Sequence, residues 1–127
     1  MPYTLYDFED NRGINRMTEW AKGQPSAQLG KLNNRLDRLE QADAELVEQL
    51  IAGAGEPSIY KIKIQGNPKL RPMLCRGPIN MRAEFTLLVG AREIQGQLVP
   101  PASEAVSKRN LVMSTQKFRC PHVRFEI

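Results

Sequence analysis

The stretch "IYKIKIQGNPKLRP", residues 59–72, alternates apolar and basic side chains and then reverses at a turn. Successive side chains on a strand point to opposite faces of the sheet. The alternation therefore predicts a strand with Tyr60, Ile62 and Ile64 on one face and Lys61 and Lys63 on the other. The letters "QGNP" are typical of a turn, and the returning segment "KLRPMLC" predicts a second strand with further cations.

Outward from this hairpin, the segment "RAEFTLLVGA", residues 82–91, predicts a third strand. Its centre is almost continuously apolar, which is typical of a strand buried on both faces. These three strands form an expected antiparallel meander. Near the start of the chain, "YTLYDF" alternates weakly and indicates a short additional strand.

Residues 26–52 carry the clearest helical pattern, because Leu29, Leu32, Leu36 and Leu39 recur at intervals of three and four. The resulting apolar stripe has two interpretations: a seam between two copies of the chain, or a face packed on the protein's own sheet. The pattern is short for a coiled coil, which favours the second. A helix is also expected within residues 14–22, and a short one within 102–114.

These elements predict one α+β domain over residues 1–127. Its helical part covers about 13–52, its sheet part about 58–92, and its C-terminal helix and tail about 100–127. We expect two N-terminal helices to pack on one face of a small antiparallel sheet. The other face would then present Lys61, Lys63 and Arg71.

Charge is unevenly distributed along the chain, whose formal net charge is +4. Residues 1–57 hold 6 Lys and Arg against 10 Asp and Glu, a net charge of −4, whereas residues 58–127 hold 12 against 4, a net charge of +8. This asymmetry indicates a polyanionic partner for the second part, with nucleic acid as the leading candidate. A solvated basic surface explains the same counts.

No apolar run approaches the roughly 18 residues that cross a bilayer, and the first residues lack the apolar region of a secretory signal. We therefore expect a cytoplasmic protein without a membrane partner. No P-loop, GxGxxG or HExxH motif is present, so no cofactor is expected. Cys120 and His122 stand two residues apart, but zinc sites normally need four such ligands, so no metal is expected either.

The segments "YKIKI", "KLRPMLC" and "EFTLLVGARE" resemble the core of the RelE/ParE toxin superfamily of toxin–antitoxin systems, with a looser likeness to its HigB-like and phage-borne branch. The resemblance implies a RelE-like fold and ribosome-dependent cleavage of mRNA, in which the RNA 2′-hydroxyl attacks the neighbouring phosphate. By position in these motifs, the catalytic residues would be Lys61, Lys63, Arg71 and Arg92. The implied partners are the ribosome, mRNA and a cognate antitoxin.

One feature departs from that family. RelE toxins carry a tyrosine shortly after the third strand, whereas "EIQGQLVPP", residues 93–101, contains none. Two alternatives to the RNase therefore stay open. One is a non-catalytic phage or prophage protein that binds nucleic acid or a protein partner, and the other is a gyrase inhibitor of the ParE type.

Further cations are candidates for nucleic-acid binding. In the tail, basic residues alternate with Phe118 and Phe125, a combination able to bind RNA backbone and bases. A closing strand whose aromatic side chains complete the core explains this segment equally well. The candidate binding residues are Lys69, Arg76, Lys117, Arg119 and Arg124.

Overall fold

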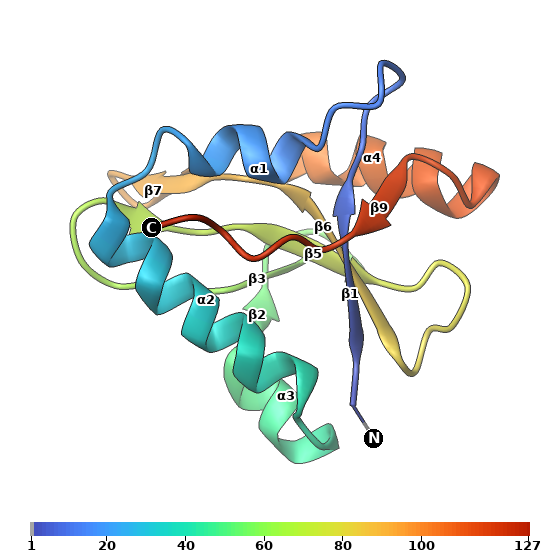
Figure 1. Cartoon of the computed structure of the whole chain (residues 1–127), viewed down its shortest axis with the longest axis horizontal. Helices are drawn as coiled ribbons and strands as arrows, with labels where there is room; N and C mark the ends of the chain where they lie inside the picture. The colour runs from blue at the N-terminus through green and yellow to red at the C-terminus, as the bar shows by residue number, and fades with distance from the viewer. Residues whose placement is uncertain (1) are drawn as a thin grey trace.

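The computed structural model describes residues 2–127 as an α+β domain (Figure 1). Its helices are α1 (Arg16–Ala21), α2 (Ser26–Glu40), α3 (Ala44–Leu50) and α4 (Ala102–Thr115). Its strands are β1 (Thr4–Phe8), β2 (Ala52–Gly53), β3 (Tyr60–Lys61), β4 (Lys69–Leu70), β5 (Met73–Arg76), β6 (Glu84–Val89), β7 (Arg92–Ile94), β8 (Gln97–Val99) and β9 (Arg119–Pro121). Within residues 2–127, no helix has the length and hydropathy that crossing a membrane requires.

The strands form two sheets. The larger has the order β2-β3-β5-β6-β1-β9, and the smaller has the order β4-β7-β8. Strand β1 runs parallel to β6, with Leu5 beside Phe85, and antiparallel to β9, with Asp7 beside Cys120. The first strand of the chain therefore lies inside the larger sheet, between strands that come much later in the sequence.

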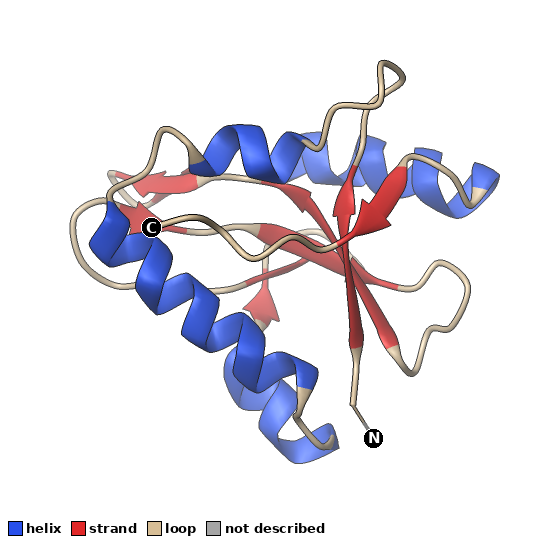
Figure 2. Ribbon diagram, in the orientation of Figure 1, coloured by secondary structure: helices blue, strands red, loops and turns tan. Residues whose placement is uncertain are grey.

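The larger sheet is covered on both faces (Figure 2). Every residue of β6 is buried, and its side chains enter two separate clusters. Phe85 and Leu87 join the cluster that contains the apolar stripe of α2, whereas Leu88 joins the cluster that contains Ala105 and Val112 of α4. The leucine stripe thus packs on the protein's own sheet, and the prediction of a third strand buried on both faces is confirmed.

The predicted RelE-like layout of two N-terminal helices, a small antiparallel sheet and a short C-terminal helix is wrong. The first element is a strand, the described residues form four helices and nine strands, and the larger sheet is mixed. The expected helix over 26–52 is divided, because α2 ends at Glu40 and Asp43 begins α3 by accepting a hydrogen bond from the Leu46 amide (2.9 Å). The α+β class itself is confirmed.

The expectation of an open sheet face was also wrong. Met73, Cys75 and Leu88 form the apolar surface on which α4 packs. The sequence pattern did not reveal this layer, because α4 has a weak apolar stripe with two fully buried positions, Ala105 and Val112. Lys61 and Lys63 therefore do not stand on a broad flat face. They lie at the margin of the sheet, towards α2 and α3.

Candidate nucleic-acid interface

A cationic groove lies between α2 and the segment that follows β3. One recess of about 300 Å³ is lined by Lys31, Asn34, Arg35, Arg38, Lys63, Ile64 and Gln65. A second recess of about 330 Å³ shares Arg35, Lys63 and Gln65 with the first and adds Lys61, Glu48 and the α3–β2 junction. We define the cationic groove by its five basic residues, Lys31, Arg35, Arg38, Lys61 and Lys63.

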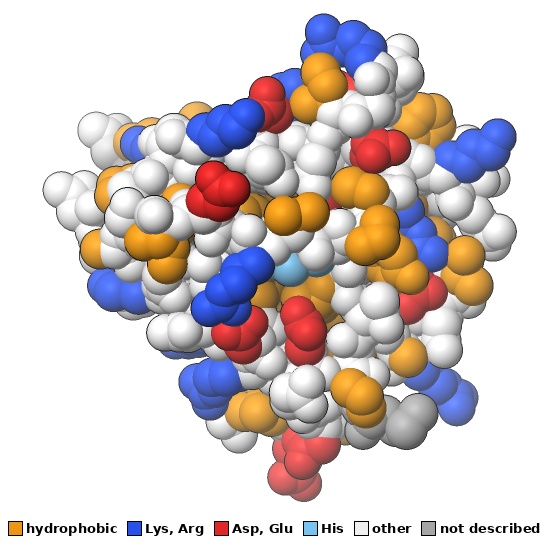
Figure 3. Space-filling view, viewed as in Figure 1, with side chains coloured by type: hydrophobic (Ala, Val, Ile, Leu, Met, Phe, Trp, Pro, Cys, Tyr) orange, Lys and Arg blue, Asp and Glu red, His pale blue; other side chains and the backbone are white. Residues whose placement is uncertain are grey.

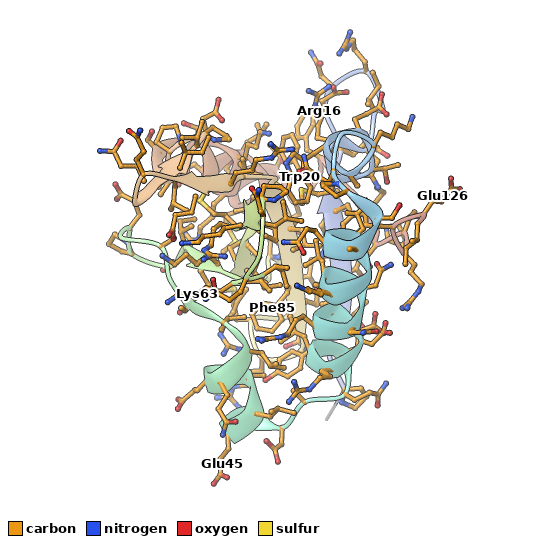
Figure 4. All side chains as sticks on the ribbon, turned by 90° about the vertical axis from the view of Figure 1, so that its left-hand side faces the viewer. Arg16, Trp20, Glu45, Lys63, Phe85 and Glu126 are labelled. Atoms are coloured by element: carbon orange, nitrogen blue, oxygen red, sulfur yellow. The ribbon has the colours of Figure 1, made fainter. Side chains whose placement is uncertain are left out.

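Local structure explains why these cations gather. Lys31, Arg35 and Arg38 stand four and three residues apart, which places them on one side of a helix, while the leucines of α2 face the sheet. Across from them, the alternation after Tyr60 buries Ile62 and Ile64 and leaves Lys63 exposed. Figure 4 shows Lys63 to one side of α2 and above α3.

The groove is almost free of negative charge. Among the described residues that line its first recess, none is acidic, and the second recess contributes Glu48 alone. Within residues 2–127, none of the five groove cations forms an ion pair with a carboxylate. Fixed cations on two facing walls create a positive potential that attracts a polyanion.

Arg71 is not on the groove surface. Its side chain is buried, with 2% of the residue exposed. Its Nη1 donates to the carbonyl oxygens of Ile64 (3.0 Å) and Leu70 (2.9 Å), and its Nε donates to Oε1 of Glu93 (3.2 Å). Its Nη2 donates to Oε1 of Gln65 (3.3 Å). The guanidinium is therefore occupied by the protein's own acceptors.

Arg92 also has a protein partner. It lies in the smaller sheet, opposite Leu70 and Val99. Its Nε donates to Oε1 of Gln24 (3.0 Å), and its Nη2 donates to the carbonyl oxygen of Gly23 (3.3 Å). Of the four residues predicted as catalytic, the structure brings Lys61 and Lys63 together in the groove and leaves the two arginines outside it.

The five other predicted binding residues do not form one surface. Lys69 lies 3.7 Å from Glu93, Arg119 pairs with Glu84 at 2.8 Å, and Arg124 pairs with Asp37 at 2.6 Å. Arg119 also stacks on the ring of Tyr6, and Arg76 on the ring of Phe85. Lys117 is exposed near the end of α4.

The tail completes the core, as the second interpretation of its sequence predicted. Phe125 is buried and packs edge-on against Trp20 and His122. Its backbone N–H donates to Oδ1 of Asn33 (3.1 Å), and its carbonyl accepts from Nδ2 of the same side chain (3.0 Å). Asn33 of α2 thereby pairs with the tail as a neighbouring strand would.

His122 contacts Asp7, a residue that sequence reasoning missed. The two side chains meet at 2.8 Å between Nδ1 and Oδ1, and Oδ2 of Asp7 accepts from Nδ2 of Asn15 (2.9 Å) and from the Val123 amide (3.1 Å). Figure 3 shows His122 recessed between neighbouring side chains. An acidic residue at an inward-facing position of β1 was a sequence signal for a buried polar contact. Its partner could not be identified from the sequence, because His122 lies 115 residues away.

This cluster does not activate the neighbouring thiol. Burial, with Asp7 and Glu9 nearby, raises the pKa of Cys120 to about 11. A nucleophilic cysteine requires the opposite shift, because the thiolate is the reactive form. Within residues 2–127, no group of three His, Cys, Asp or Glu side chains is arranged to hold a metal ion.

Comparison with known protein families, curated proteins and solved structures yields no match to the chain.

Proposed function

We propose that the protein binds RNA through the cationic groove. The observation that supports this function is the placement of five Lys and Arg side chains on two facing walls, with Glu48 as the one carboxylate among the described residues that line them. Nucleic-acid backbones carry one negative charge per nucleotide, and proteins that neutralise it gain affinity by releasing counterions.

The chemistry of the two walls suits phosphate. Arg35 and Arg38 can each offer two parallel N–H donors to phosphate oxygens, whereas Lys61 and Lys63 act as point charges. Among the residues that the structure describes, no aromatic side chain lines either recess. Base stacking should therefore contribute little, and contacts to the backbone should dominate. We therefore propose affinity that depends strongly on salt and weakly on base sequence.

Fluorescence anisotropy with a labelled oligo-U tests the proposal. If all five cations meet phosphates, the slope of log K against log salt is about −3.5 for a single strand. A variant with Arg35→Gln, Arg38→Gln and Lys63→Gln should flatten that slope to about −1.4. The matched control, Arg12→Gln, Arg82→Gln and Lys22→Gln, removes the same charge from exposed positions outside the groove. Equal losses in both variants would overturn the proposal.

A second candidate is cleavage of mRNA on the ribosome, and the joint position of Lys61 and Lys63 with Arg35 favours it. Fixed cations stabilise the negative charge that develops as the 2′-hydroxyl attacks the phosphate. Expression in a bacterial host, followed by mapping of mRNA 5′ ends with and without translation, distinguishes the two. Cuts in translated messages would support the RNase function. Intact messages, together with measurable RNA affinity, would support RNA binding without cleavage.

A further inference from the structure

We infer that Gln28 and Arg71 are positioning residues that fix the separation of the groove's two walls. The inference rests on the proposed function, because it assigns a role towards the RNA-binding groove. It also revises the role of Arg71. The RelE resemblance implied that this arginine takes part directly in catalysis. Its hydrogen bonds to the protein instead indicate that it supports one wall of the groove.

The second wall of the groove, which carries Lys61 and Lys63, continues directly into a tight loop. Residues 65–69 form this loop, which is closed at its base by two backbone hydrogen bonds between Ile64 and Leu70, at 3.0 and 3.2 Å. Lys63 and Gln65 flank the closing residue Ile64 and line the groove. Any displacement of the loop therefore moves this wall relative to α2.

Gln28 fastens the loop to α2. Only 3% of this residue is exposed. Its Nε2 donates to the carbonyl oxygens of Gln65 (3.1 Å) and Pro68 (2.5 Å). Gly66 makes the close approach possible, because a Cβ at that position would stand 2.8 Å from Nε2 of Gln28, and its φ of +126° is unfavourable for other residues.

Arg71 holds the same loop from the sheet. Its donors reach the carbonyls of Ile64 and Leu70, at the two ends of the loop, and the side chain of Gln65. Lys31 adds a bond from Nζ across the groove to the Gln65 carbonyl (3.2 Å). The loop is thus bonded from both α2 and the sheet, so the cations are positioned before a ligand arrives, which reduces the ordering cost of binding.

A double-mutant cycle separates positioning from direct contact. The variant Gln28→Met keeps the side-chain length and removes both donors, and Gln41→Met, at the exposed end of α2, is the matched control. We expect Gln28→Met to weaken oligo-U binding by about fivefold when Lys63 is present and by less than about twofold in a Lys63→Gln background. Arg71→Lys, which keeps the charge but loses the planar fork, should show the same dependence on Lys63.

Equal weakening in both backgrounds would overturn the inference, because direct contacts and general destabilisation are both independent of Lys63. Hydrogen exchange supplies a measurement that needs no ligand. Faster exchange at the Ile64 and Leu70 amides in Gln28→Met, with the amides of β6 unchanged, would support the role of Gln28 in holding the loop. Unchanged exchange at those two amides overturns it. If the wild-type protein fails to bind oligo-U, the proposed function fails, and the exchange result still decides the role of Gln28.

Discussion

Arg71 and Glu93 form an ion pair of 3.2 Å between Nε and Oε1. The arginine stands between β4 and β5, and the glutamate lies on β7. Because Arg71 also donates to the Ile64 and Leu70 carbonyls at the two ends of the loop, the pair links the smaller sheet to the loop that follows the groove wall. Lys69 also approaches Glu93, at 3.7 Å. The Glu93 carboxylate therefore balances the charges of both Arg71 and Lys69.

The Arg71–Glu93 pair predicts a specific pH dependence of stability. The hydrogen bond from Arg71 lowers the pKa of Glu93 below its ordinary value of 4.5, and the charges of Arg71, Lys69 and Lys61 act in the same direction. A lowered carboxyl pKa contributes stability that is present above the unfolded pKa and is lost as the pH falls through the folded one. Glu93→Gln should therefore be less stable than the wild type at pH 7, with the difference shrinking below about pH 4.

Urea denaturation at several pH values measures this difference. Glu126→Gln is a suitable control, because Glu126 is an exposed carboxylate near the end of the tail. A gap between Glu93→Gln and the wild type that stays constant down to pH 2.5, or about two units below the ordinary pKa, would contradict the assignment of this pair.

Gly90 packs against Trp20 so closely that a side chain cannot be added without rearrangement. A Cβ at Gly90 would stand 2.0 Å from Cδ2 of the indole. Gly90→Ala should lower the free energy of unfolding by about 1–3 kcal/mol, the usual cost of overpacking. Because Trp20 is the single tryptophan, its fluorescence emission should shift as well. Gly53→Ala is the control, since its added Cβ meets nothing within 4 Å.

Both cysteines should be poorly reactive in the folded protein. Burial raises the pKa of Cys75 to about 11 and is the largest contribution to the same rise at Cys120. At pH 7.5 each thiol is therefore almost fully protonated, and the thiolate is the form that reacts. We expect alkylation by iodoacetamide, followed by mass spectrometry, to be slow in buffer and fast in urea. Rapid labelling of Cys120 at neutral pH would instead indicate an activated Cys–His pair.

The side-chain amide of Asn33 should hold the last residues of the tail against α2. Asn33→Ala removes both partners of the Phe125 backbone, and unsatisfied buried groups cost about 1–3 kcal/mol. Limited proteolysis should then cleave the tail faster. Asn34→Ala changes the neighbouring exposed residue, and it should leave both stability and proteolysis near wild-type values.

The local patterns were predictable from the sequence. The alternation after Ile59 placed Ile62 and Ile64 in the core, and the spacing of the leucines identified the buried side of α2, because each depends on the pattern of one short segment. The strand itself is shorter than predicted, since β3 ends at Lys61. The layer formed by α4 and the pairing of β1 with β6 were not predictable from the sequence, since both depend on contacts between distant segments.

The candidate site shows the same division. Lys61 and Lys63 were identified from the alternation of residues 59–64, although β3 itself ends at Lys61. The contribution of Lys31, Arg35 and Arg38 appeared once α2 and the segment after β3 were placed side by side. The buried position of Arg71 was not predictable for a related reason. The partners of its Nη1 are backbone carbonyls of the loop, which leave no trace in the pattern of side chains.

The position of β1 has a consequence for biosynthesis. Its two neighbours in the sheet are β6 and β9. Its Asp7 contacts His122, which lies 115 residues later in the sequence. During translation, β1 and the leucines of α2 emerge long before β6 and β9, so both lack the strands that cover them until those strands have been made. Such surfaces favour aggregation and chaperone capture. A chain truncated before β9 lacks one of the two neighbours of β1 and should therefore aggregate more readily than a chain that carries β9.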